Sequence, residues 1–593
     1  MTDAEEIEGQ YIEASPSTDS SSRFLTLSSY LNAIGAGEVA TVSSLVNYLE
    51  SVTVAALHEE TPVTEDIRND VPRILSEILN FLSSSIQDDE VMDALSFELP
   101  KVVAEFAAVS DECAAAVDSI LDCLAEKCSP RDMLSILCEA LGFTNRSKNP
   151  ARYTAPLYTA LGKVTRCIQR RPFQQIAAIV PITLNVLKFL SSDISNGENE
   201  CMNLFQRALT IADSIQAIRE RLDGKATENI EAILAMYVMQ VLALLSISMG
   251  SCITSSCFPL VNQIKSLLRS CGCSFSGLMT GSDIDTFIRV TNEVEEDSSD
   301  KCFSEVKLGA SLVVIWCKGF EEQAQAAAES IANLEDELRG NQIKRWQSLA
   351  MLKHALLAPQ ISWKLKEHAI EFMLSITRDA PRIAHNEEQC DECLTYLPNL
   401  CSALQVIAAI IPYAPSRELR TNAFLVLKRV VADIPPSSRL ESLQFLIKNS
   451  SSPQMGALLI DITREELHKE INHAESVPSW WTSVVDVVEM VLRPSDGGPP
   501  NLPESSEAVL AALNLYRYVV MAESSRGSNH SGVLRKESLR RAYAEWLLPL
   551  RALVSGIISE SKNDCVVLSS VSTLEMVLYR CIELVEDRLK VCV

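Results

Sequence analysis

The sequence is poor in the residues that build strands and hairpins. Only 20 glycines occur in 593 residues, and alternating runs of Val, Ile and Thr are short. Asn-Gly and Asp-Gly pairs, which favour two-residue hairpin turns, are few. Most glycines and prolines stand in the gaps between apolar runs with helical spacing. These scarcities argue against a protein built on β-sheets and leave the helix as the main element.

Positive charge is also in short supply. The chain has 52 basic and 78 acidic residues, for a net charge of −26. A surface of this kind repels both phosphate backbones and anionic lipid headgroups. The most basic stretch, "RKESLRRAY" from Arg535 to Tyr543, is interrupted by Glu537 and predicts one solvated helix face. We therefore expect neither nucleic acid nor a membrane surface as a partner.

The N-terminus has no signal-peptide pattern, because "MTDAEEIEGQ" is acidic and lacks an apolar core segment. The 18 cysteines are scattered through apolar stretches. We therefore expect the cysteines to be reduced thiols and the protein to be cytoplasmic and nuclear.

One segment has the composition of a membrane span. No charge occurs from Ala232 to Ile264, and "ILAMYVMQVLALLSISMG" within it approaches the roughly 20 apolar residues that cross a bilayer. However, Gln240 interrupts the run, Pro259 follows it, and no Lys or Arg cluster marks a cytoplasmic edge. A helix buried among other helices, apolar on all sides, is the favoured reading, with a membrane span as the alternative.

Sequence motifs for nucleotide binding and hydrolysis are missing. Neither Gly162-Lys163 nor Gly224-Lys225 has a glycine five residues earlier, as a phosphate-binding loop requires. The segment "GCSFSG" is one residue out of register with Gly-x-Ser-x-Gly and follows no alternating strand. We expect a protein that is not an enzyme; a catalytic site assembled from residues distant in sequence is the alternative.

Metal-binding motifs are equally weak. Seven histidines occur and none belongs to a His-Glu-x-x-His pattern. The segment "HNEEQCDEC" offers His385, Cys390 and Cys393, and Cys401 follows. Cys-x-x-Cys clamps zinc when a second pair exists, and no convincing second pair is present. Thiols in a helical hairpin are favoured over a zinc or redox site, and no cofactor is expected.

What the chain does contain is a succession of amphipathic helices. Ser416 precedes a run in which Leu419, Ala423, Val426, Leu427 and Val430 share one helical face. Two further helices follow, carrying Leu440, Leu443, Leu446 and Ile447 and then Met455, Leu458, Leu459 and Ile462.

Between these last two helices stands Ser450-Ser451-Ser452. Pro453 suits the first position of the third helix, with Ser452 as its cap, so the serines predict a corner rather than a catalytic turn.

This pattern continues over hundreds of residues, and 593 residues exceed what one core holds. The sequence therefore predicts an all-α fold, an extended helical solenoid of the HEAT or armadillo type. Residues 1–22 are acidic and Ser-rich and predict a loose tail. A break at residues 292–301 separates an N-terminal helical region, 23–300, from a C-terminal HEAT-like region, 301–593, in which we expect partner binding. A monomer is expected.

All six tryptophans lie in the C-terminal half. Aromatic residues and arginine dominate many binding interfaces, which favours an interaction surface there; core packing is the alternative. The six are Trp316, Trp346, Trp363, Trp480, Trp481 and Trp546.

The C-terminal half also resembles a known family. The segments "LQVIAAIIPYAPSRELRTNAFLVLKRVVADIPPSSRLESLQFLIKNSSSPQMGALLIDITREELHKE", "WW" at 480 and "AALNLYRYVVMAE" from Ala511 are similar to the glomulin family, and to its plant branch of aberrant lateral root formation proteins in particular. The likeness is clearest over residues 400–525.

This resemblance implies a protein that binds the RING-box subunit of cullin-RING ubiquitin ligases, together with its cullin. Its C-terminal repeats would cover the RING surface that recruits the ubiquitin-conjugating enzyme, so inhibition is by steric exclusion. The family's interface positions correspond here to Arg439, Arg517 and Tyr518. The inserts "SDGGPPNLPESS" and "ESSRGSNHSGV" depart from the animal branch. A helical scaffold or transport adaptor that binds through its N-terminal half is the alternative.

Overall fold

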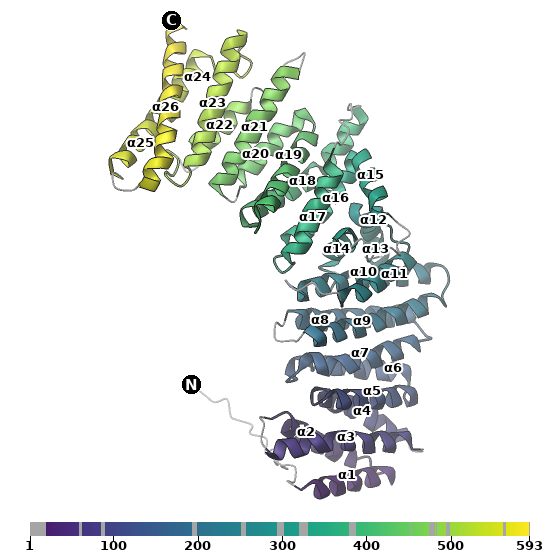
Figure 1. The fold of residues 1–593 in the computed structure, drawn as a ribbon. Coiled ribbons are helices and arrows are strands. Elements are labelled where there is room, and N and C mark those ends of the chain that lie inside the picture. The colour runs from purple at the N-terminus through teal and green to yellow at the C-terminus, as the bar shows by residue number, and fades with distance from the viewer. Residues whose placement is uncertain are drawn as a thin grey trace, which may run out of the picture. The chain divides into compact units, whose positions relative to one another are not determined.

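The computed structural model describes residues 19–58, 62–84, 89–192, 198–250, 256–292, 302–319, 330–378, 387–450, 452–473, 481, 483–493, 498–560 and 565–591. Every regular element within these ranges is a helix, as Figure 1 shows. The predicted all-α fold is confirmed. The first helix begins at Ser20, so residues 20–22, which the sequence placed in the tail, are helical.

The chain divides into two compact units. The first comprises Met1–Glu329 with Gln360–Ser362, and the second comprises Ser330–Pro359 with Trp363–Val593. The sequence placed its boundary near residue 300. The helix Val306–Gly319, which lies beyond that point, packs within the first unit.

The first unit is a stack of helices in two layers. The helices are α1 (Ser20–Gly35), α2 (Thr41–Ala56), α3 (Pro62–Ser83), α4 (Asp89–Glu105), α5 (Asp111–Lys127), α6 (Pro130–Leu141), α7 (Pro150–Arg166), α8 (Pro172–Ser191), α9 (Glu198–Arg219), α10 (Lys225–Ser248), α11 (Cys257–Ser270), α12 (Phe275–Thr280), α13 (Ser282–Asn292) and α14 (Val306–Gly319). One layer holds α1, α3, α5, α7 and α9 side by side, and the other holds α2, α4, α6, α8 and α10. Each helix buries one apolar stripe against its neighbours, which is the packing of a solenoid.

Helix α10 is apolar on all sides because other helices surround it. Residues 232–246 are all buried, and α8, α9, α11, α13 and α14 pack around it. Helix α14 approaches so closely at Gly309 that an added Cβ would lie 1.9 Å from the carbonyl oxygen of Met239. Three helices of the described chain are long and apolar enough to cross a membrane, Pro172–Ser191, Lys225–Ser248 and Leu394–Tyr413, and 89% of the apolar window of Lys225–Ser248 is buried inside the protein. The expectation of a buried helix is confirmed for α10.

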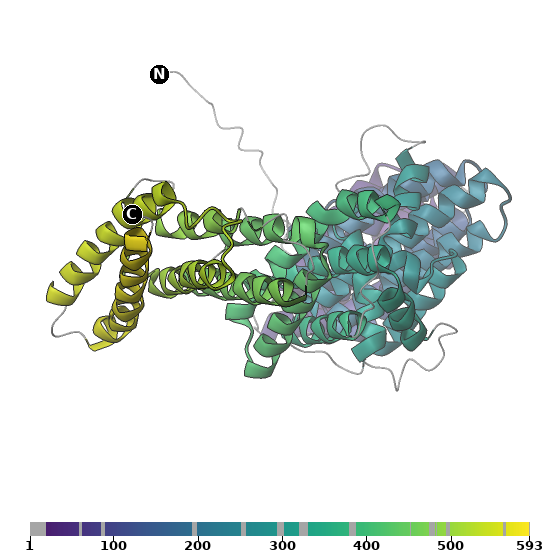
Figure 2. The same cartoon turned by 90° about the horizontal axis from the view of Figure 1, so that it is seen from above.

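The second unit repeats the two-layer arrangement. Its helices are α15 (Ile331–Gly340), α16 (Gln342–Leu357), α17 (Trp363–Thr377), α18 (Glu387–Ile410), α19 (Arg417–Asp433), α20 (Pro436–Lys448), α21 (Pro453–His473), α22 (Val484–Leu492), α23 (Ser506–Arg526), α24 (Lys536–Arg541), α25 (Leu548–Glu560) and α26 (Cys565–Val591). Helices α15, α17, α19, α21, α23 and α26 form one layer, and α16, α18, α20 and α22 form the other. The two rows of this unit are visible in Figure 2.

The predicted corners of this unit are confirmed in detail. The Ser416 hydroxyl accepts a hydrogen bond from the Leu419 amide at 3.0 Å, and the Ser452 hydroxyl accepts one from the Met455 amide at 3.2 Å. Each serine thereby satisfies an amide that the first turn of its helix leaves without a partner. Leu458 departs from the predicted apolar face, because 37% of it is exposed.

Candidate protein-interaction surface

The exposed sides of α19, α21 and α23 form a candidate surface within the second unit. Helix α21 packs against α20 and α23, α19 packs against α17 and α18, and the Lys428–Glu465 ion pair joins α19 to α21. Each of the three helices carries an exposed large apolar residue: Leu425 on α19 (37%), Leu458 on α21 (37%) and Met521 on α23 (51%). We call this surface the three-helix face and define it by Leu425, Lys428, Leu458, Arg464, His468, Arg517, Tyr518 and Met521.

Two of the three family positions lie on this face. Arg517 and Tyr518 are half-buried and adjacent on α23, so they point about 100° apart around the helix. Met521 follows Arg517 by four residues and Tyr518 by three, which places its exposed side chain between them. Within the described residues, Arg517 has neither a hydrogen-bond partner nor an ion-pair partner. Its guanidinium therefore has donors available for another molecule.

Polar contacts hold the three helices of the face together. Lys428 on α19 forms an ion pair with Glu465 on α21 at 2.6 Å, and the Tyr518 hydroxyl lies 2.9 Å from Nδ1 of His468. Partial burial raises the pKa of Tyr518, so this hydroxyl keeps its proton across the neutral range. The face is thus a positioned set of apolar, aromatic and basic groups.

The third family position, Arg439, lies inside the protein. It belongs to α20 and is 8% exposed. Its Nε and Nη2 donate to the carbonyl of Ile434, Nη2 also donates to the carbonyl of Ala432, and Nη1 donates to Glu466 and Glu470 at 2.9 Å each. A guanidinium has five N–H donors, and these five bonds use all of them. A partner could engage this group only by displacing contacts within the fold.

Most of the tryptophans are core residues. Trp316, Trp346, Trp481 and Trp546 are at most 4% exposed, so the alternative of core packing holds for these four. Trp363 is half-buried, and Trp480 lies outside the described residues. The tryptophans, which the sequence analysis used to favour an interaction surface, therefore do not mark the three-helix face. Exposed Leu425, Leu458 and Met521, which mark it, have the same helical spacing as buried residues and could not be singled out from the sequence.

Metal ligands do not gather in the described part of the chain, where no group of three or more His, Cys, Asp or Glu side chains could hold an ion. Cys401 is buried in α18. His385 lies outside the described residues, as do the side chains of Cys390 and Cys393.

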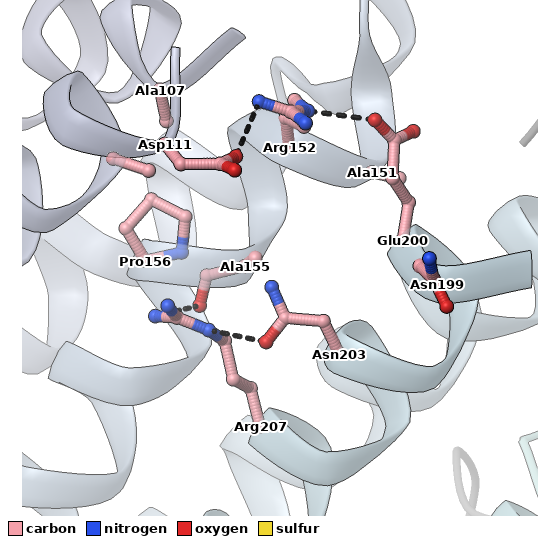
Figure 3. Close-up of a pocket in the computed structure, with 11 residues that line it drawn as sticks. Ala107, Asp111, Ala151, Arg152, Ala155, Pro156, Asn199, Glu200, Asn203 and Arg207 are labelled. Atoms are coloured by element: carbon pink, nitrogen blue, oxygen red, sulfur yellow. Dashed lines mark hydrogen bonds and ion pairs between the residues drawn. The ribbon is translucent and has the colours of Figure 1, made fainter. Parts of the chain in front are cut away.

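A depression of about 390 Å³ lies between α5, α7 and α9 in the first unit, and Figure 3 shows its lining. Arg152 bridges Asp111 at 3.1 Å and Glu200 at 2.7 Å, while Arg207 holds Asp118 with two bonds of 2.7 and 2.8 Å. The Asp111 side chain is 95% exposed, so the depression is open to water. These ion pairs hold the neighbouring helices in position. Their arrangement does not resemble that of a nucleophile with its base.

Comparison with known proteins identifies the family of the chain. A family model described as "Uncharacterised protein family, YAP/Alf4/glomulin" matches residues 43–294 and 382–576. The chain belongs to the YAP/Alf4/glomulin family. It is 41% identical over 566 residues to the Aberrant root formation protein 4 of Arabidopsis thaliana, covering 93% of this chain and 89% of that protein.

Among solved structures, this member of the YAP/Alf4/glomulin family is similar to helical-repeat proteins. A circular tandem repeat protein shares 13% identity at a TM-score of 0.27, covering 96% of this chain and 98% of the other. Importin beta in an ammonium sulfate condition shares 15% identity at a TM-score of 0.23, covering 91% and 68%.

Proposed function

We propose that this chain is a non-enzymatic inhibitor of cullin-RING ubiquitin ligases that binds the RING domain of the RING-box subunit through the three-helix face. Bound there, it blocks recruitment of the ubiquitin-conjugating enzyme and so slows ubiquitin transfer. Membership of the YAP/Alf4/glomulin family supports the proposal, since the glomulin-like segments of the sequence run through all three helices. The name of the Arabidopsis relative extends it to a role in root formation.

One observation carries the proposal: Arg517 and Tyr518 flank exposed Met521 on a helix whose other sides are packed. An apolar side chain between an arginine and a tyrosine is typical of the centre of an interface. Arg517 offers a planar fork of donors to a carboxylate or to backbone carbonyls, and Tyr518 offers apolar area with a polar tip.

The mechanism is occupation of a surface. The face lies on packed helices, so little conformational entropy is lost when a partner docks. No bond is made or broken, and inhibition depends only on occupancy of the RING surface. The thirteen described cysteines that are free thiols fit a reducing compartment, and we extend the proposal to the cytoplasm and nucleus.

The test is a binding titration of the full chain with a purified cullin and RING-box pair. Arg517→Glu should weaken binding by about tenfold or more, because it replaces an unpaired donor group with a repelling charge. The matched control is Arg580→Glu on α26, where the arginine side chain is 72% exposed and lies outside the face. Equal loss in both variants, or none in Arg517→Glu, would place the binding site elsewhere.

A further inference from the structure

A long stretch of the first unit carries only positive charge. From Ala140 to Ser192 the chain has eight basic residues and neither aspartate nor glutamate, although the whole protein has a net charge of −26. Five of the eight have partners in the structure, either carboxylates, a hydroxyl, a carbonyl or an aromatic ring. These five are Arg146, Lys148, Arg152, Lys163 and Lys188.

The other three stand together at one corner. Arg166 is the last residue of α7, and Arg170 and Arg171 immediately precede α8. All three are exposed, and none has a hydrogen-bond or ion-pair partner among the described residues. The corner that presents them is anchored. Ile168 is 5% exposed, and the side-chain amide of Gln175 donates to the carbonyl of Arg170 at 2.9 Å.

The start of α8 adds to the positive potential of this corner. Its first turn contains no acidic residue, and its N-cap residue, Arg171, accepts no hydrogen bond with its side chain. Arg171 has φ of 48°, the only left-handed value of a residue other than glycine in the described chain. The free amides of a helix start carry partial positive charge, which has the same sign as the charge of the three arginines that precede this helix in the chain.

The corners on either side carry both acidic and basic side chains. Lys163 lies near the C-terminus of α7 and Asp122 near the C-terminus of α5, and the two form an ion pair. The two helices therefore run in the same direction. The corner after α5 therefore lies on the same edge and carries exposed Arg131 beside Asp132. The corner after α9, which packs against α7, carries exposed Arg221 between Glu220 and Asp223. The purely positive patch is one repeat wide, or about 10 Å.

We propose that the α7–α8 corner binds an acidic segment of a partner protein, with carboxylates held by Arg166, Arg170 and Arg171. The charge complementarity selects an anion, and guanidinium forks match carboxylates in pairs. The small footprint favours a peptide over nucleic acid, which needs cations along several nucleotides of backbone. It also disfavours a membrane, since binding to a lipid surface needs a broader basic and apolar face.

The experiment uses the full chain and a fluorescein-labelled peptide of ten glutamates, with anisotropy measured at low and physiological salt. The double variant Arg166→Glu/Arg170→Glu should bind the peptide about tenfold or more weakly, because charge-assisted hydrogen bonds are lost. The control is Arg221→Glu on the neighbouring corner, which should stay within about twofold of the unaltered protein. Circular dichroism verifies that the variants are folded.

Three outcomes would overturn the proposal: no binding of the peptide, equal binding by the double variant, or tighter binding of a single-stranded RNA or of phosphatidylserine vesicles to the same corner. Because the corner lies outside the three-helix face, Arg517→Glu should leave peptide binding unchanged. A negative result in the peptide experiment would therefore overturn the proposal for the α7–α8 corner and would leave the proposed binding to the RING-box subunit untouched.

Discussion

Arg439 on α20 and Glu466 on α21 form an ion pair of 2.9 Å with both side chains at most 10% exposed. Glu470, one turn further along α21, accepts from the same guanidinium nitrogen. The first turn of one helix is thereby tied to the later turns of the next. The pair fixes the angle between α20 and α21, and α21 contributes Leu458, Arg464 and His468 to the three-helix face.

Arg439→Ala should destabilise the protein by about 3–5 kcal/mol, because it leaves two carboxylates without their buried partner. The control Arg464→Ala removes an arginine that is 39% exposed and pairs with Asp461 on the same helix, and it should cost no more than about 1 kcal/mol. Urea denaturation followed by circular dichroism measures both. Similar midpoints for the two variants would show that the Arg439 cluster contributes little to stability.

Met521→Asp should weaken RING-box binding by about tenfold or more without unfolding the protein. Its side chain is 51% exposed, so the substitution alters the surface and not the core. A buried charge at the centre of an interface is costly. Met576→Asp on α26 is the matched control, since that methionine is 66% exposed and lies outside the face. If both variants bind like the unaltered protein, Met521 is not covered in the complex.

Glu523 should strongly stabilise the segment that follows α23. The residue is fully buried, and its carboxylate accepts from the Trp481 indole and from the amide and hydroxyl of Ser531 at 2.7 and 2.6 Å. Glu523→Ala leaves these donors unsatisfied and should cost about 3 kcal/mol.

Trypsin cleavage after Arg526 reports the effect locally and should become faster in Glu523→Ala. The control Glu507→Ala alters an exposed glutamate at the start of the same helix and should leave the cleavage rate unchanged. Equal rates in the two variants would contradict the role of Glu523.

Stability should fall as the pH rises above about 9, through Cys581 among other thiols. Burial raises the pKa of Cys581 from 9.0 to about 12. The folded state therefore keeps a proton that the unfolded state releases, so this stabilisation is complete below pH 9 and is lost as pH rises towards 12. Each pH unit in this window costs about 1.4 kcal/mol for one such group.

Denaturation midpoints at several pH values measure this slope. Cys581→Ser removes the ionising group and keeps a donor for the Leu513 carbonyl, which the thiol approaches at 3.6 Å. Its slope between pH 9 and 11 should be shallower by about one proton. An unchanged slope would mean that Cys581 is not protected from ionisation.

The helical architecture was predictable because its signals are local. Ser416 and Ser452 cap helices within three residues, and apolar spacing marks the buried stripes, so the all-α fold and the corners followed from neighbouring residues. The burial of Arg439 was not predictable, since its two carboxylate partners lie 27 and 31 residues away in the sequence. The exposure of Leu458 depends in the same way on which helices pack beside α21.

The most direct test of the central claim is an in vitro ubiquitin-transfer assay with a purified cullin and RING-box pair and its conjugating enzyme. The unaltered protein should slow transfer in proportion to its occupancy, excess conjugating enzyme should restore the rate, and folded Arg517→Glu should not inhibit at the same concentration. Undiminished transfer in the presence of saturating unaltered protein, or full inhibition by Arg517→Glu, would contradict inhibition through the three-helix face.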